Sequence, residues 1–334
     1  SGQILADDII SDSGLLIIPK FATINDYVIK RLDEFGVKRI TVFKQKNNDR
    51  KEPLTITQLK NEYKRYVTTI KDIFNDLSLG NELNFEKVKS ISDSIYYNIV
   101  NNDDIIQCIN QLRYIDSYTF THSINVSLYA MLLANWLDLD KQDVDNAILS
   151  GILHDIGKSR IPDIILNKKG PLSNEEFNVM KTHTIIGYEL VRNLNDIKPE
   201  IKEAILYHHE KYNGNGYPFG IKGSELNIYA KIISVVDVYD ALTSDRCYKN
   251  KITPFESFKE IQDMDIGHFD LRIMLKFLYN IANYYIGSPI LMNNGKVGEI
   301  VFISPNNISR PIVKIEDKFI DLCIDNSIKI VEML

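Results

Sequence analysis

The sequence predicts a mainly helical protein, with a small mixed α/β module before the helices and a short β extension after them. Apolar residues recur at three- and four-residue spacing through most of residues 54–286, which is the periodicity of amphipathic helices. They alternate instead near both ends of the chain, as in half-buried strands. The composition suits a folded globular protein, since 44% of the 334 residues are hydrophobic and 25% are charged.

Residues 1–46 are predicted to form the N-terminal module. The segments "ILADDII" and "LLIIP" lie on either side of "SDSG", a turn-rich pattern that indicates a β hairpin. A helix is expected in "NDYVIKRLDEFG", with Asn25 as its N-cap and Gly36 at its end, and "VKRITVF" is expected to follow as a strand. The polar residues 47–53 are predicted to be a linker.

Residues 54–286 are predicted to form one helical domain. The segments "LTITQLKNEYKRYVTTIKDIFNDL" and "NFEKVKSISDSIYYNIV" have apolar residues at helical spacing. Ser173 and Glu176 match a capping box, which predicts the start of a helix that carries His183. The segment "IYAKIISVVDVYDAL" is apolar on almost every side, so its helix is expected to be buried.

Residues 287–334 are predicted to form the C-terminal β extension. Here "PILMN", "VGEIVFI" and "IVKIE" alternate around the turn patterns "NNGK" and "SPNN", which suggests a short β meander. This extension and the N-terminal module are each too small to be stable alone. We therefore expect them to pack on each other or across a dimer.

Charge and cysteine content exclude several classes of protein. A formal net charge of −6 gives no electrostatic basis for binding long nucleic acid, so a small anionic substrate would need a local cluster of metal ions, Lys or Arg. Cys108, Cys247 and Cys323 are odd in number and widely separated, which indicates reduced intracellular thiols. No apolar run is long enough for a membrane segment, and no signal-peptide pattern is visible. The expected location is the cytoplasm.

Five of the six histidines fall between positions 122 and 209, and two aspartates accompany them in the helical region. The set is His122, His154, Asp155, His183, His208, His209 and Asp237. Such nitrogen and oxygen ligands suit divalent transition metals such as iron, manganese or zinc. Seven ligands are too many for one ion that keeps an open position and about right for two, so the set predicts a pair of metal ions.

Individual members of this region have distinct expected roles. Asp155 directly follows His154 and is placed to bridge two ions. Lys158 lies one turn further along, from where its ammonium can meet a phosphate oxygen held by the metals. Asp237 lies among valines on a buried helix, where an unpaired carboxylate would cost several kcal/mol, so a metal partner is expected. His268 lies outside the set and is interpreted as structural.

The motifs "HDIGK" at 154–158 and "HHEKYNGNGYP" at 208–218 closely resemble those of the HD-GYP family, a branch of the HD-domain metal-dependent phosphohydrolases. The resemblance runs from about Tyr118 to "HFD" at 268–270. It implies a helical HD-type bundle with a two- or three-metal centre, often of iron or manganese. It also implies hydrolysis of the bacterial second messenger cyclic di-GMP to linear pGpG, and often on to GMP.

By position, the seven His and Asp residues match the family's metal ligands, and Lys158 matches its phosphate-binding lysine. On this resemblance, the adjacent His208 and His209 end a helix and present both rings to one metal of the pair. Arg246 and Lys249 match basic positions that resemble substrate-phosphate contacts. Tyr217 belongs to the GYP signature and is expected to line the substrate pocket or a partner surface.

The chain departs from the family pattern at a few positions. Tyr118 stands where three-metal members have Glu, which favours two metals over three. Asn213 and Cys247 stand where Asp and Pro are usual, and Lys249 is sometimes Arg in relatives. None of these departures removes a ligand, so the metal site is expected to be intact.

These features predict a metal-dependent phosphodiesterase that hydrolyses cyclic di-GMP to pGpG, with a hydroxide held between the two ions as the nucleophile. Asp155 and Lys158 are the predicted catalytic residues. One alternative is a phosphodiesterase for another cyclic dinucleotide, cyclic GMP-AMP. Another is a slow protein that senses cyclic di-GMP or docks on a partner through the GYP loop. The sequence leaves open whether GMP is a further product, and whether the chain forms a homodimer or binds a protein partner at that loop.

Overall fold

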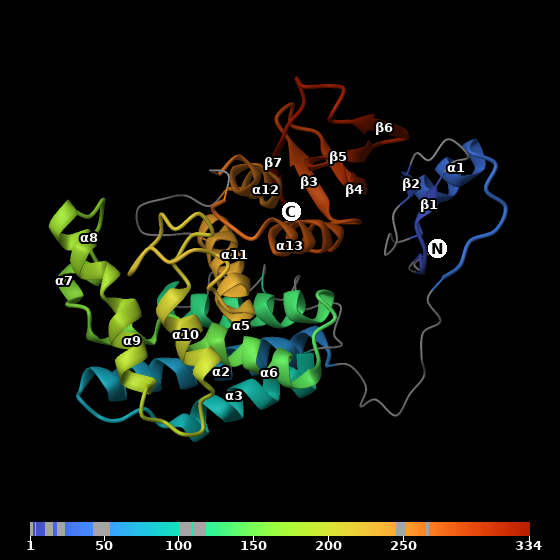
Figure 1. Ribbon diagram of the computed structural model, residues 1–334. Coiled ribbons are helices and arrows are strands. Elements are labelled where there is room, and N and C mark those ends of the chain that lie inside the picture. The colour runs from blue at the N-terminus through green and yellow to red at the C-terminus, as the bar shows by residue number, and fades with distance from the viewer. Residues whose placement is uncertain are drawn as a thin grey trace. The chain divides into compact units, whose positions relative to one another are not determined.

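The computed structural model describes residues 3, 5–10, 16–18, 24–42, 54–99, 109, 118–244, 252–264 and 267–334. The chain divides into two compact units (Figure 1). One comprises Ser1–Lys51, Thr253–Glu260 and Leu278–Leu334, and the other comprises Glu52–Ile252 and Ile261–Phe277. The first unit therefore combines the two ends of the chain, and the second contains most of the helices.

The secondary structure of the second unit is helical in its described part, with no strand, as the sequence predicts. Its elements are α2 (Ile56–Ser78), α3 (Phe85–Ile99), α5 (Tyr118–Trp136), α6 (Lys141–Leu153), the 3₁₀ helix η1 (Ile156–Arg160), α7 (Asp163–Leu166), α8 (Asn174–Lys181), α9 (His183–Val191), α10 (Pro199–Tyr207) and α11 (Ile228–Thr243). Two further helices, α12 (Pro254–Asp263) and α13 (Leu271–Asn283), contribute residues to both units.

Helices α5 and α11 form the centre of the helical unit. Helix α5 contacts α2, α6 and α11, and almost all of its described side chains are buried. Helix α11 is apolar on nearly every side and is buried, which confirms the prediction for this segment. Tyr129, Tyr239 and Phe277 pack edge to face between them, with ring centroids 5.1–6.1 Å apart. Polar residues on these two helices are therefore held in a rigid, dehydrated setting.

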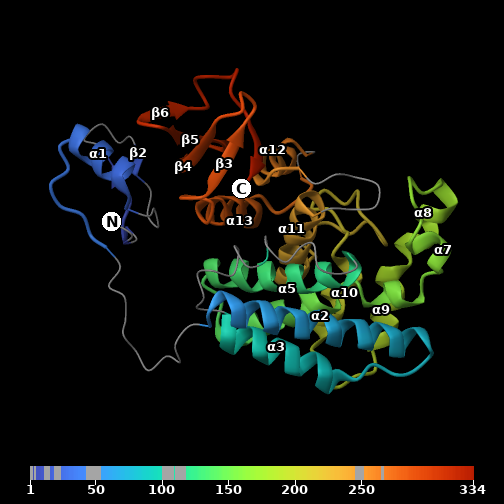
Figure 2. The same ribbon diagram turned by 180° about the vertical axis from the view of Figure 1, so that it is seen from behind.

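Helices α2 and α3 lie side by side on the outside of the helical unit (Figure 2). Both match segments in which the sequence predicts amphipathic helices. Helix α2 begins with a capping box, in which Thr55 and Gln58 each bind the other's backbone. Buried apolar side chains such as Tyr66 and Ile70 face inward, so this pair covers one side of the core.

The first unit contains two small sheets and one N-terminal helix. Strands β1 (Ile9–Ile10) and β2 (Leu16–Ile18) form the predicted hairpin, and helix α1 (Asp26–Glu34) has the predicted N-cap at Asn25. The C-terminal strands are β3 (Pro289–Met292), β4 (Val297–Ser304), β5 (Asn307–Ile315), β6 (Lys318–Asp321) and β7 (Ile330–Met333). Their antiparallel order is β6-β5-β4-β3-β7, so a meander of four strands is completed by β7 beside β3.

The N-terminal module packs on the C-terminal sheet within the same chain, which is one of the two arrangements expected from the sequence. Val28 and Leu32 of α1 share a buried apolar cluster with Phe302 of β4. The Asn25 side-chain amide donates to the Val301 carbonyl at 2.8 Å, and the Tyr27 ring lies 5.3 Å from that of Phe302. Each segment thus supplies the apolar partner that the other lacks.

The prediction of a strand in "VKRITVF" is wrong for the residues that the structure describes. Residues 37–41 form no strand, and Val42 makes only an isolated bridge with Leu5. The backbone amide of Val37 instead donates to the Leu32 carbonyl and completes the end of α1. Among the described residues, the backbone pairing of this segment is the Leu5–Val42 bridge and the hydrogen bond from the Ala6 amide to the Thr41 carbonyl at 2.8 Å, which do not make a ladder.

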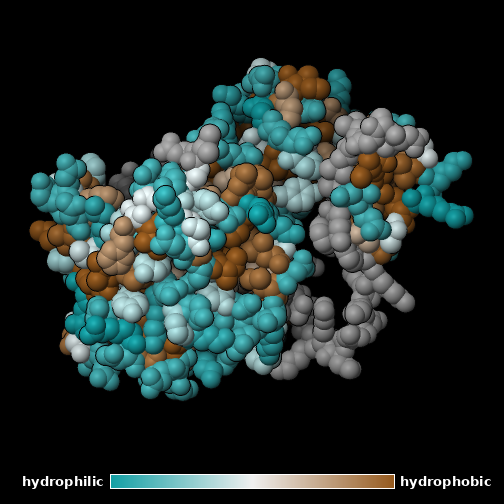
Figure 3. Space-filling view, viewed as in Figure 1, coloured by the Kyte–Doolittle hydropathy of each residue, from teal (hydrophilic) through white to brown (hydrophobic). Residues whose placement is uncertain are grey.

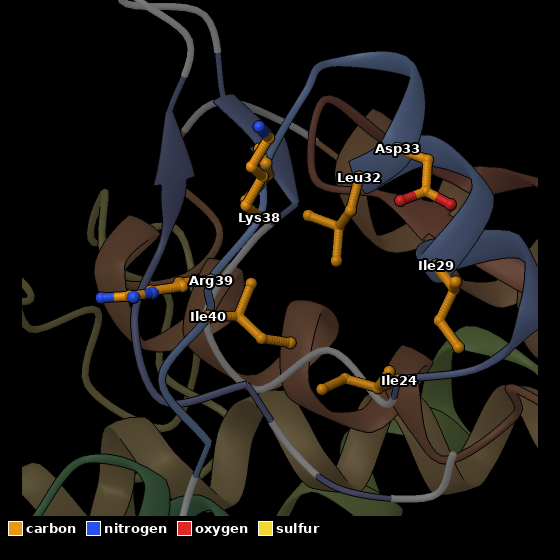
Figure 4. A pocket seen from close by; sticks show the side chains of 8 residues that line it. Ile24, Ile29, Leu32, Asp33, Lys38, Arg39 and Ile40 are labelled. Carbon is orange, nitrogen blue, oxygen red and sulfur yellow. The ribbon is translucent and has the colours of Figure 1, made fainter.

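A hollow of about 190 Å³ lies under α1 in the N-terminal module (Figure 4). The side chains of Ile24, Ile29, Leu32 and Ile40 surround it, and that of Arg39 points away. The hollow is therefore lined mainly by apolar groups.

No helix among the described residues has both the length and the apolar character needed to cross a membrane.

Candidate metal centre

The seven His and Asp side chains singled out in the sequence meet at one place in the helical unit. His122 is on α5, His154 and Asp155 join α6 to η1, His183 begins α9, His208 and His209 follow α10, and Asp237 is on α11. They form two groups, in each of which the ligand atoms lie within 4.8 Å of one another. One group is Asp155, His183, His208 and His209, and the other is His122, His154 and Asp237.

Asp155 lies between the two groups and turns one oxygen toward each. Its Oδ1 is 3.4 Å from Nε2 of His183 and 3.9 Å from Nε2 of His208. Its Oδ2 is 3.4 Å from Nε2 of His154 and 3.6 Å from Nε2 of His122. A carboxylate in this position can bind a cation on each side, which is the bridging role predicted from its place after His154.

The imidazoles are oriented by hydrogen bonds on the side away from Asp155. Nδ1 of His154, His183 and His208 each lies 2.7–2.9 Å from the carbonyl oxygen three residues earlier in the chain. An Nδ1–H that donates to a carbonyl leaves Nε2 unprotonated and available as a ligand. The same local arrangement therefore presents three Nε2 atoms to the centre from three different helix ends.

His122 is oriented by a carboxylate rather than by a carbonyl. Its Nδ1 lies 2.8 Å from Oδ2 of Asp240, and Asn125 donates to Oδ1 of the same carboxylate at 2.9 Å. Tyr63 donates in turn to the Asn125 side chain at 2.7 Å. Asp240 is fully buried, so these bonds fix both its position and that of the His122 ring.

Two buried polar atoms of the centre lack the partner that their burial requires. His154 Nε2 and Asp155 Oδ1 have no hydrogen bond in the part of the chain that the structure describes. A buried acceptor without a partner is unfavourable by about 1–3 kcal/mol. Two such acceptors in one cluster therefore indicate that a cation binds between them. The buried His and Asp cluster thus suits divalent metal ions.

The protonation states are those that metal ligands require. Burial alone would raise the pKa of the Asp155 and Asp237 carboxyls. Lys158 and neighbouring imidazoles outweigh burial at Asp155, and imidazoles alone outweigh it at Asp237, so both pKa values are well below the usual range. Dehydration lowers the pKa of His183 to about 3, that of His209 to about 4 and that of His208 well below its ordinary value. Near neutral pH the two carboxylates are therefore anionic, and the imidazoles of His183, His208 and His209 are neutral, as metal binding requires.

His122 behaves in the opposite way. Burial favours its neutral form, but hydrogen bonds and charges from Asp237 and Asp240 outweigh burial and raise the pKa of His122 to about 9. Its Nε2 lies 3.0 Å from Oδ1 of Asp237. In the metal-free protein a proton on His122 thus compensates part of the negative charge that a cation would otherwise neutralise.

A close backbone contact near the centre depends on a glycine. A Cβ at Gly157 would lie 1.9 Å from the His183 carbonyl oxygen and 2.5 Å from the Gly187 amide nitrogen. The absence of a side chain therefore lets η1 and α9 approach closely, and this approach brings Asp155 and His183 together. The sequence analysis did not identify this role, although Gly157 lies within the "HDIGK" motif.

The GYP loop is attached to the centre by a buried carboxylate. Glu210 is 2% exposed, and its Oε1 accepts hydrogen bonds from the backbone amides of Phe219 at 2.7 Å and Gly220 at 2.9 Å. A Cβ at Gly216 would lie 2.4 Å from Cα of Glu210, so the loop packs directly on its own start. As a result the Tyr217 ring lies 4.7 Å from the His209 ring.

Several predicted details differ from the arrangement observed. Helix α6 ends at Leu153, and Lys158 lies in η1, where its ammonium donates to Oδ2 of Asp155. The Ser173 capping box opens α8, which ends at Lys181, so His183 begins a separate helix. His208 is the C-cap of α10, in agreement with the expected helix end.

Other predicted residues lie away from the centre or outside the description. His268 belongs to neither ligand group, and its backbone carbonyl accepts from the Tyr212 amide at 3.0 Å; the structural role of its side chain stays a prediction. Arg246 and Lys249, the predicted substrate-phosphate contacts, lie outside the described residues. Asp240 was missed by the sequence analysis; its position three residues after Asp237 on a buried helix was the available signal.

The fold and the site define a helical protein with a buried centre suited to divalent metal ions. A family model described as "HD domain" matches residues 107–273, which is half of the chain. The chain belongs to the HD domain family, and its "HHEKYNGNGYP" segment places it in the HD-GYP branch.

Known proteins resemble this chain in sequence and in fold. A cyclic di-GMP phosphodiesterase of Pseudomonas aeruginosa is 30% identical over 251 residues, which cover 75% of this chain and 60% of that protein. A 3′3′-cGAMP-specific phosphodiesterase of Vibrio cholerae is 34% identical over 157 residues, which cover 47% of this chain and 30% of that protein. The chain thus spans less than two thirds of either relative.

A solved structure supports the fold assignment. The HDG"Y"P protein from Bdellovibrio bacteriovorus matches with a TM-score of 0.58 over 84% of this chain and 95% of that chain, at 16% sequence identity. The mainly helical HD-type fold predicted from the sequence, with an α/β module before it and a β extension after it, is thereby confirmed.

The pKa shifts predict that the metal-free protein is most stable near pH 6.5. Below about pH 6.5 the unfolded chain protonates its histidines while His183 and His209 stay neutral, so stability falls as pH falls toward 4. Above 6.5 the folded state keeps a proton on His122 that the unfolded chain releases, so stability falls as pH rises toward 9. For each proton by which the folded and unfolded states differ, the free energy of unfolding changes by on the order of 1 kcal/mol per pH unit.

Urea unfolding of the chelator-treated protein at pH 5, 6.5 and 8.5 checks this prediction. The single tryptophan, Trp136, lies on α5 in the helical unit, so its fluorescence reports unfolding of the part that carries the centre. A midpoint that changes steadily in one direction across the three pH values would contradict the assigned protonation states.

Replacing Asp240 by Asn is expected to lower metal affinity by about 10- to 100-fold, because His122 loses the carboxylate that orients its ring. Manganese titration followed by calorimetry or by electron paramagnetic resonance measures this effect. Asp93→Asn, at an exposed position on α3, is the matched control and should bind as the unchanged protein does. Equal metal affinity in the Asp240 and Asp93 variants would show that Asp240 does not orient His122 for metal binding.

Proposed function

We propose that this protein is a metal-dependent phosphodiesterase that hydrolyses cyclic di-GMP to linear pGpG. The observation that supports this most strongly is the position of Asp155, with one carboxylate oxygen toward each of two groups of potential ligands. The names of similar proteins, such as the cyclic di-GMP phosphodiesterase of Pseudomonas aeruginosa, suggest the substrate.

The seven His and Asp residues are proposed to hold two divalent ions, for which iron and manganese are the best candidates. His183, His208 and His209 with Asp155 would hold one ion, and His122, His154 and Asp237 with Asp155 would hold the other. Bound ions of this kind polarise phosphoryl oxygens and bring the pKa of water toward neutrality. The intracellular setting expected from the reduced cysteines is consistent with either metal.

The remaining residues are proposed to bind and orient the substrate. Lys158 is partly exposed beside Asp155, so its ammonium is placed to contact a nonbridging phosphate oxygen. Arg246 and Lys249 are proposed to contact a phosphate, and Tyr217 to form the pocket wall beside His209. Hydrolysis adds one water across the P–O3′ bond, which leaves a 3′ hydroxyl on one ribose and a 5′ phosphate on the other.

A second candidate substrate is cyclic GMP-AMP. The 3′3′-cGAMP-specific phosphodiesterase of Vibrio cholerae is 34% identical to this chain, so the two substrate classes occur among its relatives. Comparison of kcat/KM on cyclic di-GMP, cyclic GMP-AMP and linear pGpG with the same metal-loaded protein distinguishes the candidates. It also shows whether GMP is a product.

A homodimer and a partner at the GYP loop stay predictions of the sequence.

His154→Ala and Asp155→Asn are expected to lower turnover of cyclic di-GMP by more than about a hundredfold, because the first removes an imidazole ligand and the second replaces the bridging carboxylate by a neutral amide. Product formation under anaerobic, metal-replete conditions is followed by chromatography, with metal content measured on the same sample. Asp93→Asn serves again as control. Full turnover in either cluster variant would refute the proposed site, and tight binding without turnover by the unchanged protein would favour a sensor.

A further inference from the structure

The ligand side chains of the proposed active centre differ in exposure. The side chains of His122, His154, Asp155, His183 and His208 are at most 2% exposed, and that of Asp237 is 10% exposed. The side chain of His209 is 26% exposed. His209 is the most exposed of the seven ligand side chains, so the side chains that border its ring are placed to contact a substrate at the centre.

A row of aromatic rings leads outward from His209. The Tyr217 ring lies 4.7 Å from the His209 ring and is tilted by 34°, and the Phe177 ring of α8 lies 6.3 Å from the Tyr217 ring in an edge-to-face arrangement. The Lys181 ammonium lies over both outer rings, 5.3 Å from the Phe177 centroid and 6.0 Å from the Tyr217 centroid. These three side chains form one continuous wall from the centre to solvent.

Helix α8 has features that packing alone does not explain. It contains no buried residue, and Phe177 is 46% exposed although the rest of the helix is largely polar. It projects with α7 from one end of the helical unit, where hydrophobic surface is exposed (Figures 1 and 3). A capping box from Ser173 and Glu176 fixes its start. An ordered helix thus holds an aromatic ring open to solvent beside the entrance to the centre.

Lys181 supplies a cation at the same place. Among the described residues no carboxylate lies within ion-pair distance of its ammonium, whereas the nearby Lys168 is paired with Glu176. A contact with ring faces holds an ammonium only weakly at an exposed site, so Lys181 can donate to a ligand acceptor. Guanine presents two acceptors, O6 and N7, on one edge, whereas adenine presents an acceptor and a donor there.

We propose that Phe177 and Lys181 form a base-binding subsite, in which the Lys181 ammonium moves off the Phe177 ring face, one guanine of the cyclic dinucleotide stacks on that face, and the edge of the guanine accepts a hydrogen bond from the ammonium. This inference rests on the proposed function and names the part of the substrate that α8 recognises. Stacking of a base on an aromatic side chain does not depend on which base is present, and the lysine adds the preference for guanine. Phe177 and Lys181 are thus specificity-determining residues, and neither reaches the reacting atoms.

Steady-state kinetics on cyclic di-GMP with the metal-loaded protein test this subsite. Phe177→Ala is expected to raise KM about tenfold or more with kcat within about twofold of the unchanged protein, and Phe177→Tyr, which keeps an aromatic face, to restore KM. Lys181→Met is expected to raise KM for cyclic di-GMP and to leave inhibition by cyclic di-AMP nearly unchanged. Val179→Ala, at a residue of similar exposure on the same helix, is the matched control and should have unchanged KM.

The outcomes separate this inference from the proposed function. If the unchanged protein hydrolyses cyclic di-GMP but Phe177→Ala leaves KM unchanged, or lowers kcat alone, the subsite is overturned and the function stands. Equal effects of Phe177→Ala and Val179→Ala also overturn it, because they would reflect a general disturbance of α8. If the unchanged protein with its metal bound does not hydrolyse cyclic di-GMP, the proposed function fails and the subsite fails with it.

Discussion

A buried carboxylate surrounded by imidazoles is the feature on which the rest of the helical unit depends. Asp155 is 1% exposed and lies within 4 Å of four histidine nitrogens, and one of its oxygens has no hydrogen-bond partner among the described residues. Such a group is strongly unfavourable unless cations compensate it. The lysine beside it and the proton on His122 supply part of this compensation, and a pair of metal ions would supply the remainder.

Several separate local contacts position the ligands of the centre. Three histidines sit at or beside helix ends, and each is oriented by the carbonyl three residues earlier. The fourth is oriented by Asp240 from a neighbouring buried helix. Gly157 lets two of the elements approach, and Glu210 attaches the GYP loop. The ligands are thus held from different helices, so their geometry depends on the packing of the whole helical unit.

Much of this could be predicted from the sequence, because ligand types and helical periodicity are local properties. The long helices, the β extension and the convergence of the seven His and Asp residues agree with the sequence analysis. Asp240, Gly157 and Glu210 act through contacts with residues that are distant in sequence or through backbone packing, which a residue pattern does not reveal. The strand expected at 37–43 is not formed over its described residues, 37–42, for the same reason, since ladder partners are set by the tertiary fold.

The central claim is that Asp155 stands between two cations. Crystals of the manganese-loaded protein, measured at the manganese absorption edge, test it directly through the anomalous difference map. The account predicts two anomalous peaks about 3.5–4 Å apart, one on each side of the Asp155 carboxylate. A single peak away from Asp155, or a map without peaks in which the seven side chains keep their positions, would contradict it.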